Sequence, residues 1–235
     1  MYQVKEIFYT LQGEGTHSGR AAVFMRFSGC NLWTGREVDR AQAICQFCDT
    51  DFVGVDGENG GKYTTAEELA LKACRVAIGD REETSNVDGL LIVLTGGEPL
   101  LQVDAALIDA LHAYGFEIAV ETNGTIKVPA GLDWVCVSPK AGSEIVQKSG
   151  NELKLVYGQK GLTPEQFESW DFDHFYLQPM DTLRVSSKRS DYSTIQASNK
   201  SDGLTDSLTD QVIAYCKAHP KWKLSLQTHK ILNIA

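Results

Sequence analysis

Residues 90–99 read LLIVLTGGEP, and this stretch decides the fold class. A short, continuous apolar run suits a strand buried on both faces, as in a parallel sheet. Comparable β-type runs recur at residues 22–27, 116–122, 134–137, 153–157, 175–179 and 223–227. Helical patterns fall between them, over residues 65–78, 103–114 and 204–218. Strands that alternate with helices predict an α/β protein built on a parallel sheet.

Polar and small residues stand where the apolar runs stop. These groups are Thr95-Gly96-Gly97-Glu98-Pro99, Glu121-Thr122-Asn123-Gly124, Ser138-Pro139-Lys140 and Gln178-Pro179. The carboxyl ends of strands form the active face of barrels and open α/β sheets, so these groups are expected to face one shared cavity. Taken singly, each motif is more often only a turn signal. Together they indicate a ligand site.

Three cysteines carry the strongest chemical signal in the chain. Cys45 and Cys48 are separated by two residues, and fourteen residues separate them from Cys30. Iron–sulfur clusters usually take four thiolates, so a set of three predicts a cluster with one open iron, which marks a reactive site. The alternative is a structural zinc site, which would need a fourth ligand such as His17.

Composition narrows the function classes. The chain has 235 residues and a net charge of −9, which argues against a nucleic-acid backbone as its main partner. The first residues lack the pattern of a signal peptide, and no apolar run approaches the roughly 20 residues that span a bilayer. We therefore expect a cytoplasmic protein, where clustered cysteines more often mean metal or catalysis than disulfides.

The cysteine loop and the Gly-Gly-Glu-Pro motif resemble those of the radical S-adenosylmethionine enzymes. The resemblance implies a modified, incomplete (β/α)6 TIM-like barrel in a single domain over residues 1–235, with residues 31–44 as an expanded cluster loop. It also implies that Cys30, Cys45 and Cys48 hold a [4Fe–4S] cluster, whose open iron binds S-adenosylmethionine. The usual family loop has three residues between the first two cysteines, so this chain departs from the common spacing. Residues 51–62 and 184–203, rich in Gly, Asp, Ser or Lys, are expected to be surface insertions.

A narrower resemblance covers nearly the whole chain. Its motifs are FYTLQGEG at 8–15, RFSGC at 26–30, CDT at 48–50, ETNG at 121–124, VSPK at 137–140 and the tail LQTHKILNIA at 226–235. These are similar to the motifs of the 7-carboxy-7-deazaguanine synthases. That family converts 6-carboxy-5,6,7,8-tetrahydropterin to 7-carboxy-7-deazaguanine with release of ammonia, in queuosine and 7-deazapurine biosynthesis. The expanded cysteine loop is a known variation within it.

The resemblance also implies roles for single residues. Those expected to bind S-adenosylmethionine are Phe47, Gly97, Glu98, Ser138, Pro139, Lys140 and Gln178. Those expected to bind the pterin substrate are Leu11, Gln12, Gly13, Glu14, Arg26, Thr95, His229 and Ala235. Arg26 is the expected carboxylate clamp, because a guanidinium binds a carboxylate bidentately. Thr50 is expected to bind Mg²⁺, and its alternative role is that of a capping residue.

The resemblance also implies binding partners, and the sequence leaves three other functions open. An electron donor such as flavodoxin or ferredoxin and a homodimeric state follow from the resemblance. One alternative is a different radical enzyme, such as a glycyl-radical activating enzyme, which acts on a protein. Another is a small iron–sulfur electron carrier, and a third is a zinc-stabilised binding module.

Overall fold

The sheet is organised around β4 (Leu91–Gly96), the strand predicted from the LLIVL run. Ile92 and Leu94 pack into the main core on one face, while Leu91 and Val93 pack into a second cluster on the other. Burial on both faces explains why the run is continuously apolar. The computed structural model describes residues 1–79, 87–181 and 207–234. The expected insertion at 184–203 lies outside the described residues, as does Ala235.

In this described part, nine strands form one sheet in the order β3-β1-β2-β4-β5-β6-β7-β8-β9. The neighbouring strands from β2 to β9 run parallel, and β1 pairs antiparallel with both β2 and β3. The strands besides β4 are β1 (Tyr2–Leu11), β2 (Ala21–Phe27), β3 (Gly61–Tyr63), β5 (Glu117–Thr122), β6 (Trp134–Val137), β7 (Ser149–Tyr157), β8 (Asp171–Pro179) and β9 (Trp222–Leu224). The two edge strands, β3 and β9, have three residues each.

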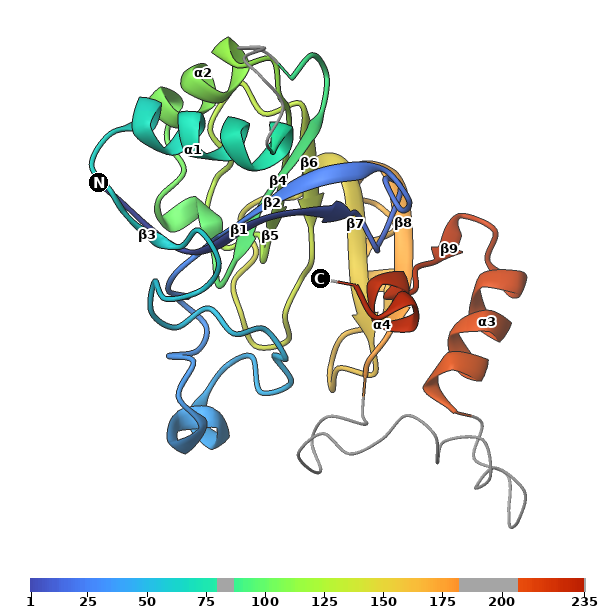
Figure 1. The fold of residues 1–235 in the computed structure, drawn as a ribbon. Coiled ribbons are helices and arrows are strands. Elements are labelled where there is room, and N and C mark those ends of the chain that lie inside the picture. The colour runs from blue at the N-terminus through green and yellow to red at the C-terminus, as the bar shows by residue number, and fades with distance from the viewer. Residues whose placement is uncertain (80–86, 182–206, 235) are drawn as a thin grey trace.

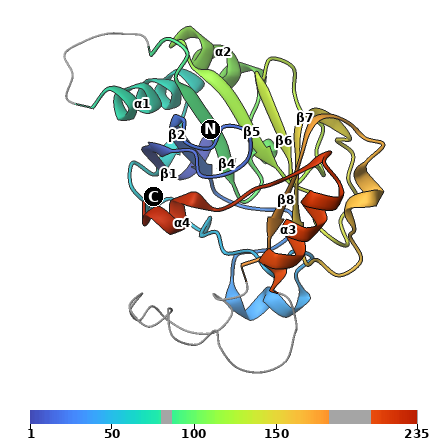
Figure 2. The same cartoon turned by 90° about the vertical axis from the view of Figure 1, so that its right-hand side faces the viewer.

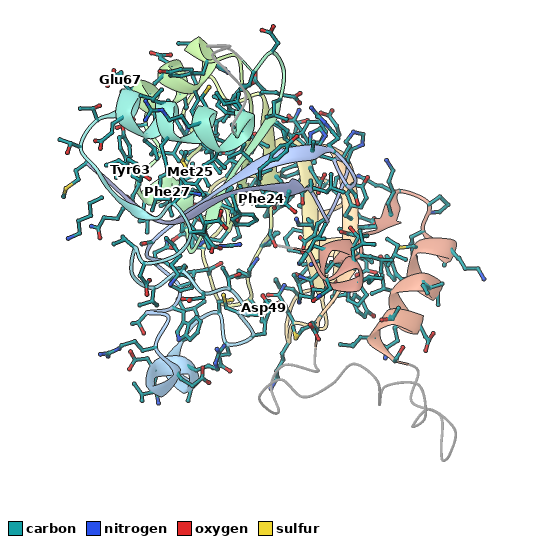
Figure 3. All side chains as sticks on the ribbon, viewed as in Figure 1. Phe24, Met25, Phe27, Asp49, Tyr63 and Glu67 are labelled. Carbon is teal, nitrogen blue, oxygen red and sulfur yellow. The ribbon has the colours of Figure 1, made fainter. Side chains whose placement is uncertain are left out.

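Two helices cover one side of the sheet. α1 (Ala66–Ile78) and α2 (Ala105–Ala113) lie side by side (Figure 1). Thr65 caps α1 by accepting a hydrogen bond from the Glu68 amide. Met25 and Phe27 of β2 lie in the core beneath these helices (Figure 3).

The other helices lie near β8 and β9. α3 (Leu208–Ala218) packs against these two strands, and the short α4 (Thr228–Leu232) follows β9 (Figure 2). Residues 123–133 and 138–148, which link β5 to β6 and β6 to β7, contain no helix. The fold is therefore mixed α/β in one domain, with fewer helices than a full strand–helix alternation would give.

The inner face of the sheet is polar on β7 and β8. Leu153 and Leu155 of β7 face the apolar cluster that includes Val212 of α3. Because side chains alternate along a strand, Glu152 and Lys154 point to the opposite face, and both are buried. The sheet curls enough that Thr228, after β9, donates its backbone and hydroxyl hydrogen bonds to the Gly13 carbonyl, after β1. The polar face is therefore turned inward.

Two loops extend the β1–β2 end of the sheet. Residues 31–44, which include the 3₁₀ helix η1 (Glu37–Gln42), project at the end of the molecule opposite to α1 and α2 in both views (Figures 1 and 2). Residues 51–62 lie along β1, where Lys5 forms ion pairs with Asp51 and Asp56. Phe52 of this segment is fully buried. In the part of the chain described, no helix has the length and apolar character to cross a membrane.

Candidate active site

The three cysteines lie at the carboxyl end of β2 and in the loop that follows it. The Cys30 sulfur accepts hydrogen bonds from the backbone amides of Leu32, at 3.4 Å, and Trp33. The Leu32 carbonyl in turn accepts from the amides of Ile44, at 3.0 Å, and Cys45, at 3.4 Å, which returns the long loop to its origin. The fourteen intervening residues are thus folded back into a closed segment, as the low cost of loop closure allows.

The Cys45 and Cys48 thiols share a hydrogen bond. This bond lowers the pKa of Cys48 to about 6 and raises that of Cys45, because one proton serves both sulfurs. The Thr50 amide also donates to Cys48. Burial raises the pKa of Cys30. Backbone N–H groups directed at sulfur favour the thiolate form, which is the form that binds iron.

A structural zinc site at the three cysteines would need a fourth ligand, for which His17 is the candidate. His17 instead contacts Arg20, with Nδ1 3.0 Å from the guanidinium, and packs on Trp134 at 4.3 Å between ring centroids. Among residues 1–79, 87–181 and 207–234, no three His, Cys, Asp or Glu side chains are arranged to hold a single metal ion. The donor set at the cysteines is all sulfur, which suits an iron–sulfur cluster.

The Gly-Gly-Glu-Pro motif lies against the cysteine loop. A Cβ atom on Gly97 would meet the Gly29 carbonyl oxygen at 2.1 Å and the Cys30 Cβ at 2.8 Å, so only glycine fits there. The Glu98 amide donates to the same carbonyl at 3.0 Å. The end of β4 is therefore held directly beside Cys30.

Glu98 is occupied by the protein's own donors. Its buried carboxylate accepts from the Leu100 amide at 3.0 Å, the Thr122 hydroxyl at 2.8 Å and the Asn123 amide at 2.8 Å. Burial raises the pKa of Glu98, and these hydrogen bonds oppose that rise. A carboxylate has about four acceptor positions, so one is left over for a ligand. The observed contacts make Glu98 a brace between the ends of β4 and β5.

Ser138, Pro139 and Lys140 directly follow β6, and the charge of Lys140 acts on two of the cysteines. The Lys140 ammonium donates to the Ser138 carbonyl at 2.7 Å and to its hydroxyl at 2.6 Å. The same positive charge lowers the pKa values of Cys45 and Cys48, although hydrogen bonding and burial have larger effects on them. Lys140 is therefore within electrostatic reach of the thiols.

Arg26 lies on β2 in register with Thr95 of β4 and Glu6 of β1. Its Nε donates to the Glu6 carboxylate at 2.8 Å. Within the described part of the chain, the two Nη groups of Arg26 carry no hydrogen bond. One edge of the guanidinium is therefore fixed and the other is available, which is a suitable arrangement for a carboxylate clamp.

A buried charged triad lies on the polar inner face. The Lys154 ammonium is 2.7 Å from Glu14 and 2.9 Å from Glu121, and its side chain is only 5% exposed. Burial alone would raise the pKa of Glu14, but the charge and hydrogen bond of Lys154, with a hydrogen bond from Gln227, lower it to about 2. Burial raises the pKa of Glu121. Despite its own burial, Lys154 has a raised pKa because both carboxylates favour the ammonium.

The glutamines and the tail complete this inner wall. Gln178, at the end of β8, donates to Glu14 at 3.1 Å, and Gln227 donates to the same oxygen at 2.9 Å. His229 lies against Gly13, where an added Cβ would be 2.4 Å from the imidazole Nδ1. Burial lowers the pKa of His229, so the neutral ring is favoured. The tail therefore covers the turn that contains Gln12, Gly13 and Glu14.

Asp49 and Thr50 connect the cysteines to the tail. The Asp49 carboxylate, labelled in Figure 3, is 2.6 Å from the Lys230 ammonium of α4. Lys230 also contacts Asp181 at 2.9 Å. Thr50 is partly buried and stands directly after this ion pair in the sequence. The expected Mg²⁺ ligand is thus close to both the cysteine loop and the tail.

Most of the expected site residues lie on the carboxyl edge of the sheet or its inner face. Phe47 is half-buried between the two cysteines, whereas Leu11 is exposed and Gln12 accepts a hydrogen bond from the Glu14 amide. Sequence reasoning missed Lys154 and Gln227, and it gave Glu121 no role of its own. The alternating pattern Glu152-Leu153-Lys154-Leu155 carried the signal, because alternation places the charged pair on one face.

Several known proteins of one name are similar to this chain over almost its full length. No protein-family model matches the chain. It is 57% identical over 233 residues, 99% of both chains, to the 7-carboxy-7-deazaguanine synthase of Caulobacter vibrioides. It is 56% identical over 233 residues, again 99% of both chains, to that of Bradyrhizobium diazoefficiens. To that of Bacteroides thetaiotaomicron it is 38% identical over 234 residues, which cover 100% of this chain and 99% of that protein.

A solved structure shares the fold. The crystal structure of QueE from Escherichia coli matches with a TM-score of 0.60 and 25% identity, over 96% of this chain and 93% of that chain. The nine-stranded sheet, the shared fold and the names of the relatives together define an α/β enzyme. With relatives of this identity over almost the full length, the chain belongs to the 7-carboxy-7-deazaguanine synthase family.

Proposed function

We propose that the chain converts 6-carboxy-5,6,7,8-tetrahydropterin to 7-carboxy-7-deazaguanine and ammonia by radical chemistry, within queuosine and 7-deazapurine biosynthesis. The observation that carries the proposal is that one curled sheet holds three neighbouring cysteines beyond the carboxyl end of β2 and a buried charged triad on its inner face. The curled sheet corresponds, in this proposal, to an incomplete barrel of the radical S-adenosylmethionine type.

Cys30, Cys45 and Cys48 would hold the [4Fe–4S] cluster, because amides already point at two of their sulfurs. When bound, the cluster and S-adenosylmethionine supply the radical that abstracts hydrogen from the substrate. The chain's own contribution is to bind, orient and shield. Gly97 has no side chain, so its backbone can lie directly against Cys30. Lys140 places a positive charge near the thiols.

The substrate would lie along the polar inner face. The free edge of Arg26 suits the substrate carboxylate, and Thr95 is its neighbour on β4. Glu14 stays ionised, so its carboxylate suits the N–H groups of a pterin ring. His229 and Gln12 border the same turn. Thr50 would bind Mg²⁺ together with water and substrate oxygens, the ligands that this ion prefers.

The remaining groups have supporting roles in the proposal. Phe47, Ser138, Pro139 and Gln178 would surround S-adenosylmethionine, with Glu98 bracing the strand ends. A flavodoxin or ferredoxin would deliver the electron, and the enzyme would act as a cytoplasmic homodimer.

The test is anaerobic reconstitution with iron and sulfide, followed by incubation with S-adenosylmethionine, reductant, Mg²⁺ and the carboxy-tetrahydropterin. The expected product is 7-carboxy-7-deazaguanine, identified by mass, with one ammonia released per turnover. Cys30→Ala should lose cluster and product, whereas Cys216→Ala, which removes a thiol on α3, should keep both. A wild-type protein that forms the cluster and cleaves the cofactor but makes no product would favour another radical enzyme. A cluster spectrum unchanged by S-adenosylmethionine would favour an electron carrier.

A further inference from the structure

Arg40 in the expanded cysteine loop is the feature that the proposed chemistry leaves unused. Its Nη1 group donates to the backbone carbonyls of Gln46 at 2.8 Å and of Cys48 at 3.0 Å. Both carbonyls belong to the four-residue turn that carries Cys45 and Cys48. One side chain from the loop therefore bridges two carbonyls of that turn.

The Arg40 guanidinium is itself held on two sides. Its Nε and Nη2 groups form a fork with the Glu37 carboxylate, at 2.8 and 2.9 Å. Its plane lies over the indole of Trp33, with 4.1 Å between the guanidinium carbon and the ring centroid. Trp33 is buried and meets Phe52 edge-on at 5.6 Å between ring centroids. The position of Arg40 is therefore built into the loop and is not a chance surface contact.

The charge of Arg40 is permanent, because a guanidinium stays protonated in proteins. The pKa of Arg40 is raised, chiefly by the Glu37 hydrogen bond and to a lesser degree by the nearby Cys48 and Cys45 thiols. The paired Glu37 carboxylate is 76% exposed and screened by water, whereas the guanidinium contacts the cysteine turn, so the positive charge dominates there. A positive charge near an iron–sulfur cluster favours the reduced state, because reduction adds negative charge.

We infer that Arg40 is a positioning residue for the cluster, which shapes the Cys45–Cys48 turn and favours reduction of the cluster. The inference rests on the proposed function. The expanded loop thereby acquires a role, since it supplies Arg40, which contacts the cysteine turn, and Trp33 and Glu37, which hold Arg40.

The experiment compares the wild-type protein with Arg40→Gln, Arg40→Lys and the control Arg36→Gln, each reconstituted anaerobically. Arg36 lies in the same loop and pairs with Asp39, but in the described part of the chain its side chain donates to no carbonyl of residues 45–48. Two quantities are measured: the midpoint potential by an EPR-monitored redox titration, and the half-life of the cluster under a chelator.

Arg40→Gln should disfavour reduction about tenfold, which is about 59 mV for a one-electron couple, and should shorten the cluster half-life several-fold. Arg40→Lys keeps the charge but loses the planar fork, so its potential should stay near wild type while the half-life still falls. Arg36→Gln should change neither quantity. If Arg40→Gln takes up no cluster although its circular dichroism is native, the positioning role is supported. If Arg40→Gln fails to fold, the cluster half-life of Arg40→Lys tests the positioning role.

Wild-type potential and half-life in Arg40→Gln would overturn the inference, as would equal losses in the Arg36→Gln control. A wild-type half-life in Arg40→Lys would overturn the positioning role. Failure of the proposed function has a different signature, since it would appear in the wild-type protein as absent cluster or absent product.

Discussion

Replacing Lys154 by Met tests the buried triad directly. The change keeps the length of the side chain but leaves Glu14 and Glu121 without the ammonium that lies 2.7 and 2.9 Å away from them. Breaking a buried ion pair by removing one partner typically costs about 3–5 kcal/mol. Linkage gives a similar size: a fall in the Glu14 pKa from 4.5 to about 2 corresponds to about 3 kcal/mol of stability at neutral pH.

The pH dependence follows from the sign of that shift. The folded-state pKa of Glu14 lies below its unfolded value, so its contribution is fully present above about pH 4.5 and is lost as the pH falls towards 2. The raised pKa of Glu121 works in the opposite direction and reduces the net effect. In Lys154→Met the buried carboxylates lose the ammonium that keeps them ionised, so they take up protons at a higher pH than in the wild type. The loss of stability should therefore be largest near pH 7 and smaller at pH 4.5.

The assay is anaerobic urea unfolding at pH 7 and pH 4.5, followed by far-UV circular dichroism and tryptophan fluorescence. We expect a loss of about 3–5 kcal/mol at pH 7, equivalent to about 6–20 °C in Tm for a chain of this size. Lys160→Met, at an exposed lysine, is the control and should stay within about 0.5 kcal/mol of wild type. A loss below about 1 kcal/mol, or a deficit that is the same at both pH values, would refute the reasoning.

Three further predictions address the site. Arg26→Lys should raise KM for the pterin about tenfold to a hundredfold through loss of bidentate binding, while KM for S-adenosylmethionine stays constant; equal rises in both would contradict a carboxylate clamp. Thr50→Val should flatten the Mg²⁺ dependence of turnover, and an unchanged Mg²⁺ titration would exclude Thr50 as the ligand. Lys230→Met removes the bridge between Asp49 and Asp181, so hydrogen exchange at residues 227–234 should accelerate at least tenfold; wild-type protection there would show that the bridge does not hold the tail.

Local patterns predicted the centre of the sheet well. The LLIVL run became β4, and the helix with Thr65 as a candidate cap became α1, because short-range burial and capping suffice to specify such elements. The prediction of a parallel sheet is confirmed for β2 and β4 to β9. Long-range pairing was harder: β3 exists only because Gly61 to Tyr63 pair with Val4 to Tyr2 across the intervening loops.

The candidate site was only partly predictable, for a similar reason. Gly97 and Cys30 are separated in the sequence, yet their contact follows from where adjacent parallel strands end. Lys154 was not predicted as a site residue because residues 153–157 look like an apolar run. Its partners Glu14 and Glu121, which stabilise the ammonium form, come from distant segments. Local sequence patterns could not predict the contacts of Lys230 with Asp49 and Asp181 either.

The shortness of β3 and β9 has a consequence for assembly. A long, bare outer strand offers its unpaired amides and carbonyls as a template on which another chain can add a strand. Among residues 1–79, 87–181 and 207–234, each edge of the sheet presents only three residues, so little backbone is available there for another chain to pair with. Pairing of these two edge strands between two copies would give only a few backbone hydrogen bonds, so association of copies at these edges would depend on side-chain contacts.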